Sequence, residues 1–258
     1  MKSFIVGSGW KMELSYSQSI RAAIELDEKL KGFHDFPVVI FPAFTALAAI
    51  HQCISPESCV KLGGQDVFWE ESGSYTGEVS AQMLLDVGCE YVEINHQERR
   101  TFLRETDEMS NKKLKMALSD GLKPFLCIGE EKKGADEETR KYIKSQMLLL
   151  LKNISCTDVK EIIFAYEPRW AIGNYGKISF AHIEKSHGLI RSVIGSLYGT
   201  DVAHDVKIIY GGGITMDSYA RIAELQNVNG LFTTKCGINP SLYSEIAVTS
   251  AKLLSRGI

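Results

Sequence analysis

The sequence predicts an α/β fold built on parallel strands. Short apolar runs alternate with longer amphipathic stretches, a pattern typical of strands that are joined by helices. Eight such units fit within 258 residues, and one closed α/β barrel typically takes about 250 residues. Because no Pro/Gly/Ser-rich linker divides the chain, a single domain over residues 1–258 suffices. Periodicity alone leaves an open, doubly wound sheet as the alternative to a barrel.

The strand predictions rest on continuous runs of apolar and aromatic residues, which are typical of strands buried on both faces. In chain order, these runs are residues 4–6, 37–41, 60–63, 91–94, 124–128, 162–166, 206–210 and 230–232.

The helix predictions rest on apolar residues spaced three and four apart. In residues 16–30 this face consists of Tyr16, Ile20, Ala23, Leu26 and Leu30. The same spacing predicts helices over residues 137–153, 181–198, 217–225 and 242–254.

The composition is that of an ordinary globular protein, with 45% hydrophobic and 24% charged residues. A net charge of −3 gives no reason to expect nucleic acid or an anionic membrane as a partner. The apolar stretches fall far short of the roughly 20 residues that span a membrane. Six cysteines show neither a CxxC pair nor a metal-ligand spacing. Without a recognisable secretion signal, we expect free thiols and a cytoplasmic location.

Residues 161–173 form the most informative segment, because an apolar run there ends abruptly in Glu167. Pro168 cannot continue a strand, which places Glu167 at the strand's C-terminal end. A carboxylate held on a rigid element can take a proton from a small ligand. The small residues up to Gly173 suggest a flap with a glycine pivot. Taken alone, a surface glutamate at a strand end is an equally good interpretation.

This segment resembles the block that carries the general base and closing lid in the triosephosphate isomerase family. Other blocks resemble the family in the same order along the chain: Gly9-Trp10-Lys11-Met12, residues 41–45, residues 75–80, residues 95–100, residues 127–130 and residues 210–212. The resemblance implies a single (β/α)8 barrel of the TIM type with eight parallel strands, and it decides against the open sheet. In such barrels, the loops after the strands build the active site.

The resemblance also implies a catalytic trio of Lys11, His96 and Glu167. Glu167 matches the family's base. His96 matches a neutral imidazole that donates a hydrogen bond to the substrate carbonyl oxygen, and Lys11 matches a cation that offsets the charge of a phosphorylated substrate and its enediolate. The plainer alternatives are a surface glutamate, a structural histidine and a solvated lysine. The remaining histidines are expected at the surface: His34, His51, His182, His187 and His204.

A set of small and polar residues is expected to bind substrate and phosphate together with Lys11. Glycines let backbone N–H groups approach an anion, which is the role implied for Gly213. The other expected members are Gly9, Gly173, Thr234 and Lys235.

Further residues are expected to support the site without touching the substrate. Glu98 and Arg99 are expected to pair beside His96, with a helix-surface ion pair as an almost equal alternative, and the role of Glu130 is similarly ambiguous. Cys127 is expected to pack beneath the site and not to act as a nucleophile, because no base is evident beside it. Thr76 resembles the tip of the family's interlocking loop, which implies a homodimer.

The chain departs from the family pattern mainly where substrate and phosphate are recognised. Gly9 stands where most relatives have Asn, Gly213 stands where they have Ser, and Thr234-Lys235 stands where they have a Gly-Gly pair. The lid is about one residue longer than usual. Because the trio is intact, we expect retained isomerisation chemistry with altered recognition.

The leading prediction is an isomerase that needs neither cofactor nor metal and acts on a small phosphorylated sugar. It would interconvert dihydroxyacetone phosphate and glyceraldehyde 3-phosphate through an enediolate, as in glycolysis and gluconeogenesis. A four-carbon erythrulose phosphate is a nearly equal alternative substrate, and a non-catalytic phosphate-binding barrel is a remote alternative. A metal-dependent barrel enzyme has no support, since the candidate residues show no ligand cluster along the sequence.

Overall fold

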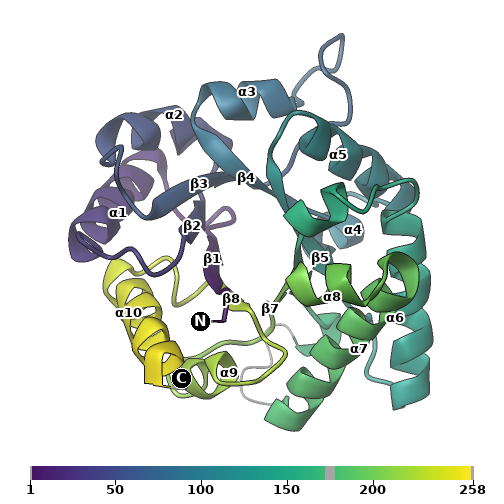
Figure 1. Cartoon of the computed structure of the whole chain (residues 1–258). Coiled ribbons are helices and arrows are strands. Elements are labelled where there is room, and N and C mark those ends of the chain that lie inside the picture. The colour runs from purple at the N-terminus through teal and green to yellow at the C-terminus, as the bar shows by residue number, and fades with distance from the viewer. Residues whose placement is uncertain (1, 172–177, 257–258) are drawn as a thin grey trace.

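The computed structural model describes residues 2–171 and 178–256, and in it eight parallel strands close into a barrel (Figure 1). Each strand pairs with the next in chain order, and β8 pairs with β1. A closed ring of this kind confirms the predicted (β/α)8 class. It excludes the open sheet, in which the first strand would not return to pair with the last.

All eight predicted runs form strands, with ends that differ from the predictions by up to three residues. The strands are β1 (Ile5–Gly9), β2 (Val38–Phe41), β3 (Val60–Gly64), β4 (Cys89–Ile94), β5 (Lys123–Ile128), β6 (Ile163–Tyr166), β7 (Lys207–Tyr210) and β8 (Gly230–Thr233).

The helices surround the barrel and cover its outer face (Figure 1). They are α1 (Tyr16–Lys29), α2 (Phe44–Cys53), α3 (Ala81–Asp86), α4 (Gln97–Phe102), α5 (Asp107–Ser119), α6 (Asp136–Leu150), α7 (Phe180–Tyr198), α8 (Thr200–Asp205), α9 (Tyr219–Ala223) and α10 (Pro240–Arg256). The predicted helices are confirmed as α1, α6, α7, α9 and α10. No helix in the described residues is both long and apolar enough to cross a bilayer.

The strands separate two apolar cores, because successive side chains of a strand point to opposite faces. Outward side chains pack against the helices in a large cluster. Inward side chains fill the barrel, where the rings of Phe41, Phe125 and Phe232 meet at centroid distances of 5.0–5.6 Å. This packing fills the barrel below its rim, and the loops after the strands border the mouth above it.

All six cysteines are free thiols, as expected, and Cys89, Cys127 and Cys236 are buried.

Candidate active site

A pocket of about 160 Å³ opens at the C-terminal ends of the strands. Its walls come from residues at or just after the ends of β1, β4, β6, β7 and β8. A parallel barrel places all these ends on one side, which brings together residues that are far apart in the sequence. The predicted residues that line the pocket are Gly9, Lys11, His96, Glu98, Glu167, Gly213, Thr234 and Lys235. Gly173 lies outside the described residues.

Glu167 directly follows β6 and is 6% exposed. Its backbone N–H donates to the carbonyl of Ile128 on the neighbouring β5 over 2.8 Å, which fixes the residue to the barrel rim. Among the described residues, its Oε2 atom has no hydrogen-bond partner, and it lies 3.6 Å from His96 Nε2. Burial raises the pKa of Glu167 to about 8, and the charge of Lys11 opposes that rise. Glu167 is thus an oriented carboxyl whose pKa suits proton abstraction near neutral pH.

Two glycines make the space that Glu167 occupies. A Cβ atom at Gly211 would lie 2.6 Å from Glu167 Cγ, and a Cβ atom at Gly129 would lie 2.4 Å from the Glu167 carbonyl oxygen. Both distances are shorter than van der Waals contact, so a side chain at either position would displace Glu167. The glycine of the Tyr210-Gly211-Gly212 block therefore positions the candidate base.

His96 is the N-cap of α4, and its Nδ1 accepts the backbone N–H of Glu98 over 3.2 Å. A neutral imidazole that accepts at Nδ1 carries its proton on Nε2, and Nε2 faces Glu167. Burial, and then the charge of Lys11, lower the pKa of His96 to about 4. The ring is therefore neutral at pH 7 and presents an N–H donor to the pocket.

Lys11 lies just after β1 in a left-handed backbone conformation, with φ of +52°. A conformation that is costly for a non-glycine residue persists only where its surroundings hold it. Here the Lys11 carbonyl accepts a hydrogen bond from Gln65 Nε2 over 2.8 Å, and Lys11 Nζ lies 2.7 Å from Glu98 Oε1. Burial disfavours the ammonium, but the hydrogen bond and charge of Glu98 outweigh it and raise the pKa of Lys11. The pocket therefore contains a permanent positive charge.

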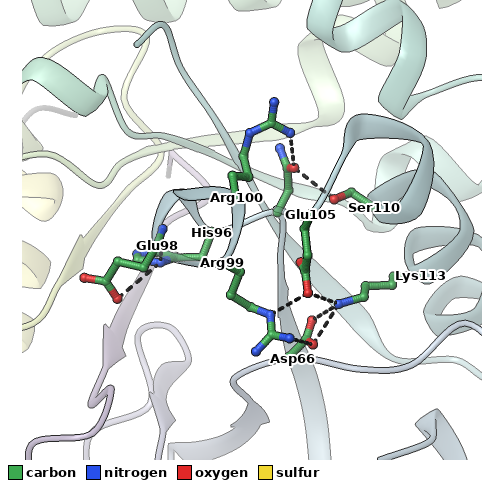
Figure 2. A network of polar contacts seen from close by, with 9 residues as sticks. Asp66, His96, Glu98, Arg99, Arg100, Glu105, Ser110 and Lys113 are labelled. Atoms are coloured by element: carbon green, nitrogen blue, oxygen red, sulfur yellow. Dashed lines mark hydrogen bonds and ion pairs between the residues drawn. The ribbon is translucent and has the colours of Figure 1, made fainter. Parts of the chain in front are cut away.

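The predicted Glu98–Arg99 pair is wrong. Glu98 points to Lys11 and to His96, whereas Arg99 points to the other side of α4, where it binds Asp66 at 2.8 Å and Glu105 at 2.7 Å (Figure 2). The physical reason is that consecutive residues on a helix do not face each other. Glu98 lines the pocket, and Arg99 does not.

Arg99 belongs to a buried ion network that sequence reasoning missed. Lys113 of α5 is 1% exposed and lies 2.7 Å from Asp66 and 2.6 Å from Glu105 (Figure 2). The network pairs two carboxylates with two cations and ties the loop after β3 to α4 and α5. A repeating helical pattern in the sequence cannot reveal this network, because the four residues come from four separate segments of the chain.

Asn95 and Glu130 anchor the backbone on either side of the pocket. Asn95 donates from Nδ2 to the Cys127 carbonyl over 2.7 Å, and its Oδ1 accepts from Arg100. Glu130 is buried and accepts hydrogen bonds from the Tyr166 hydroxyl at 3.1 Å and from Trp170 Nε1 at 2.7 Å. Glu130 therefore holds the segments just before and after Glu167, which resolves its ambiguous role in favour of support.

Glu93 is a pocket residue that sequence reasoning missed. It points into the barrel, two residues after the inward-facing Tyr91 of β4. Its Oε1 lies 3.8 Å from both His96 Nε2 and Cys127 Sγ. Burial, and then the charge of Glu167, raise the pKa of Glu93 well above its usual value. One feature of the sequence could have identified Glu93: it is a carboxylate within an apolar run of the kind that forms a strand buried on both faces.

Glu93, His96 and Glu167 also correct the expectation that the candidate residues form no ligand cluster. Each offers one potential ligand atom, and the three atoms lie within 4.8 Å of one another. Distance along the sequence hid this grouping. The tautomer of His96 opposes metal binding, because its Nε2 carries the ring proton and has no lone pair for a metal. Nε2 could bind a metal only if that proton moved to Nδ1, where it would face the backbone N–H of Glu98.

Two further expectations need correction. Cys127 is buried as expected, but the carboxyls of Glu93 and Glu167 lie beside it. Burial and these two charges raise the pKa of Cys127 well above its usual value, so the thiol stays protonated.

His187 is fully buried, not at the surface, and its Nδ1 lies 2.8 Å from the Ile183 carbonyl. The helical repeat of α7 places His187 on the inner face, one turn after Ile183.

The comparisons with known proteins agree with this geometry. A family model described as triosephosphate isomerase matches residues 4–249. The chain is 34% identical over 247 residues to a protein of Dictyoglomus thermophilum and 35% identical over 247 residues to one of Thermoanaerobacter pseudethanolicus, each match covering 95% of this chain and 99% of that protein. It is 37% identical over 231 residues to a protein of Caldanaerobacter subterraneus, covering 89% of this chain and 92% of that protein. All three relatives are named triosephosphate isomerase. The chain therefore belongs to the triosephosphate isomerase family.

Proposed function

We propose that this protein interconverts dihydroxyacetone phosphate and glyceraldehyde 3-phosphate without a cofactor. One observation carries the proposal: the buried carboxyl of Glu167 faces the N–H of a neutral His96 across 3.6 Å, within a pocket that Lys11 also lines. A base, a neutral hydrogen-bond donor and a cation are the groups that proton transfer next to a carbonyl requires. The names of the relatives support the same substrate.

In this mechanism, the Glu167 carboxylate removes a proton from the carbon beside the carbonyl. The electron pair of the C–H bond forms a C=C bond, and a carbonyl electron pair moves onto oxygen to give the enediolate. The Nε2–H of His96 and the ammonium of Lys11 stabilise that oxygen. His96 Nε2 then gives its proton to that oxygen and takes the proton of the neighbouring hydroxyl, which leaves the charge on the second oxygen. The electron pair of the second oxygen forms the new carbonyl as the C=C bond takes the proton from Glu167 at the adjacent carbon, so that atoms and charges balance.

The phosphate is proposed to bind at the wall formed after β7 and β8. Gly213, Thr234 and Lys235 line this part of the pocket, and backbone N–H groups at glycines can approach an anion closely. Lys235 brings positive charge to this wall. Gly9 lines the opposite side, after β1. Gly173 is proposed to join the phosphate contacts.

A homodimer in the cytoplasm is proposed for the assembled enzyme. Large apolar side chains are exposed in the segments after β1 and β4, with Met12 97%, Phe102 77% and Leu103 59% exposed. Exposed apolar surface of this kind marks protein–protein contacts. Between β3 and α3 the chain extends away from the barrel, and Thr76 is exposed there (Figure 1). Sedimentation of the purified chain tests the proposal, and a monomer at all micromolar concentrations would contradict it.

The proposed reaction is tested by measuring kcat/KM with dihydroxyacetone phosphate, glyceraldehyde 3-phosphate and the two erythrulose phosphate enantiomers. We expect turnover of the triose phosphates and its loss in Glu167→Gln, which keeps the size of the side chain but cannot accept a proton. Glu161→Gln, at an exposed position just before β6, is the matched control and should retain full activity. Preference for an erythrulose phosphate, or turnover by Glu167→Gln, would contradict the proposal.

A further inference from the structure

A second buried carboxyl, that of Glu93, lies in the pocket, and the mechanism above does not use it. Glu93 is 6% exposed and lines the same pocket as Glu167 and His96. The titratable groups that face it come from five segments around the pocket: Lys11 after β1, His96 after β4, Glu98 of α4, Cys127 of β5 and Glu167 after β6. Burying a carboxyl is costly, so its position among the reacting groups calls for an explanation.

The local packing opens the Glu93 carboxyl to the pocket. Its Oε1 lies against the thiol of Cys127 at 3.8 Å. On its other side, a Cβ atom at Gly9 would lie 3.6 Å from Oε2. Because Gly9 has no side chain, the space beside Oε2 is part of the pocket. A larger residue at position 9 would occupy that space and lie next to the carboxyl. A bound ligand can therefore contact Glu93.

The surroundings of the two pocket carboxyls assign them different protonation states. Two carboxylates in one buried site disfavour each other's ionisation, so one of them retains its proton. The largest charge effect on the pKa of Glu167 is that of Lys11, which lowers it, whereas the largest charge effect on the pKa of Glu93 is that of Glu167, which raises it. When Glu167 is ionised, Glu93 remains a neutral carboxylic acid and offers an O–H donor.

We propose that Glu93 is a further catalytic residue, which donates a hydrogen bond to the same substrate oxygen that receives the Nε2–H of His96. The Glu93 carboxyl lies beside His96 Nε2, with Oε1 at 3.8 Å, and its Oε2 is the oxygen beside the pocket space at Gly9, so one substrate oxygen can lie within hydrogen-bond reach of both residues. When Glu167 removes the C–H proton and charge moves onto this oxygen, both hydrogen bonds strengthen, and no proton leaves Glu93. This role rests on the proposed isomerase function.

The kinetic test compares Glu93→Met, which has no donor, with Glu93→Gln, which keeps an N–H donor of similar reach. Removing one donor from a developing oxyanion typically lowers kcat by about 10²–10³-fold. We expect that loss in Glu93→Met with little change in KM, and kcat within about tenfold of wild type in Glu93→Gln. Wild-type kcat in Glu93→Met, or equal losses in the two variants, would overturn the proposal.

Glu90→Gln is the matched control, because Glu90 is an exposed residue of the same strand, three positions before Glu93. It should leave kcat unchanged. Circular dichroism and melting of each variant identify any misfolded protein. Because Glu93→Gln replaces a neutral acid with a neutral amide of similar size, it should fold even if Glu93→Met does not.

An infrared measurement tests the protonation state independently of turnover. At pH 7, the difference spectrum between wild type and Glu93→Gln should contain the C=O band of a protonated carboxyl. That band should shift when 2-phosphoglycolate binds, since its carboxylate imitates the charged oxygens of an enediolate. Absence of the band, or a band that does not respond to binding, would overturn the role of Glu93. A wild type that shows this band but does not turn over triose phosphates would instead contradict the proposed function alone.

Discussion

At the scale of single residues, burial sets the pH range in which Glu167 can act as a base. The carboxyl must be ionised to take a proton, and burial raises its pKa to about 8. We predict that kcat/KM rises roughly tenfold between pH 7 and pH 9 as the free enzyme loses this proton. A pH–rate profile with glyceraldehyde 3-phosphate checks this, and a flat profile over that range would contradict it.

The position of Glu167 depends on the absence of a side chain at residue 211. In Gly211→Ala, the new Cβ would lie 2.6 Å from Glu167 Cγ, so the base must move. We predict that kcat falls about 10²-fold, the typical effect of misplacing a catalytic group by about 1 Å. Gly188→Ala is the control, because its Cβ would meet its nearest neighbour, Asn227 Nδ2, at an ordinary 3.6 Å. Equal kcat in the two variants would refute this dependence.

The sequence predicted part of the candidate site because some residues lie in continuous motifs. Glu167 follows an apolar run and precedes a proline, and His96 and Lys11 lie in blocks that resemble the family. Glu93 was missed because only the strand's alternation, combined with a closed barrel, shows that it points into the pocket. The protonation of His96 at Nε2 depends on a contact with the backbone of Glu98, which no spacing rule gives.

At the scale of secondary-structure elements, the ion network of Lys113 holds α4 and α5 against the loop after β3. Lys113→Met would leave Asp66 and Glu105 buried with less positive charge beside them. We predict that the free energy of unfolding falls by about 3–5 kcal/mol, as is typical when one partner of a buried ion pair is removed. Lys112→Met, at the exposed neighbouring position, should change it by less than about 1 kcal/mol. Urea denaturation of the two variants at one protein concentration tests this, and equal stabilities would contradict the network's importance.

Among the elements, the strands were easier to predict than the helices. Most strand residues of this barrel are buried on both faces, so each strand contains a short, mainly apolar run in the sequence; Lys61 of β3 and Glu90 of β4 are among the exceptions. The helices α3, α4 and α8 have six residues each, too few turns for a repeating apolar face. The start of α4 matters most for function because His96 is its N-cap, and no repeating apolar pattern marks that start.

At the scale of the whole molecule, the pocket carboxyls should make the protein less stable as pH rises. The pKa of Glu167 is about 8 in the folded state, compared with an ordinary value of 4.5. Between pH 4.5 and pH 8, the Glu167 carboxyl of the unfolded chain loses its proton, while that of the folded protein keeps it. The contribution of Glu167 to stability is therefore fully present below pH 4.5 and is lost as the pH rises through 8. Glu167→Gln removes this dependence.

We therefore predict that Glu167→Gln is more stable than wild type, with a difference in unfolding free energy that grows from pH 5 to pH 8. The difference should then level off at a few kcal/mol, because each pKa unit corresponds to about 1.4 kcal/mol. Urea denaturation across this pH range, at fixed protein concentration, measures it. A difference that does not change with pH would show that burial does not perturb Glu167 in the folded protein.

The closed barrel also explains why function follows from the arrangement of strand ends. Lys11, His96 and Glu167 are separated by 85 and 71 positions in the chain, yet all three line one pocket. The order of the strands around the ring brings them together, above the filled interior of the barrel. Local sequence patterns predict the strands, whereas the distances within the pocket arise only when the ring closes.

Proton exchange at the substrate carbon tests the central claim most directly. Dihydroxyacetone phosphate is incubated with the protein in D₂O, and deuterium incorporation at the carbon that loses the proton is followed by NMR. Wild type should incorporate deuterium rapidly, and Glu167→Gln should not incorporate it above the rate without protein. Incorporation by the variant at the wild-type rate, or none by wild type, would contradict the assignment of Glu167 as the base.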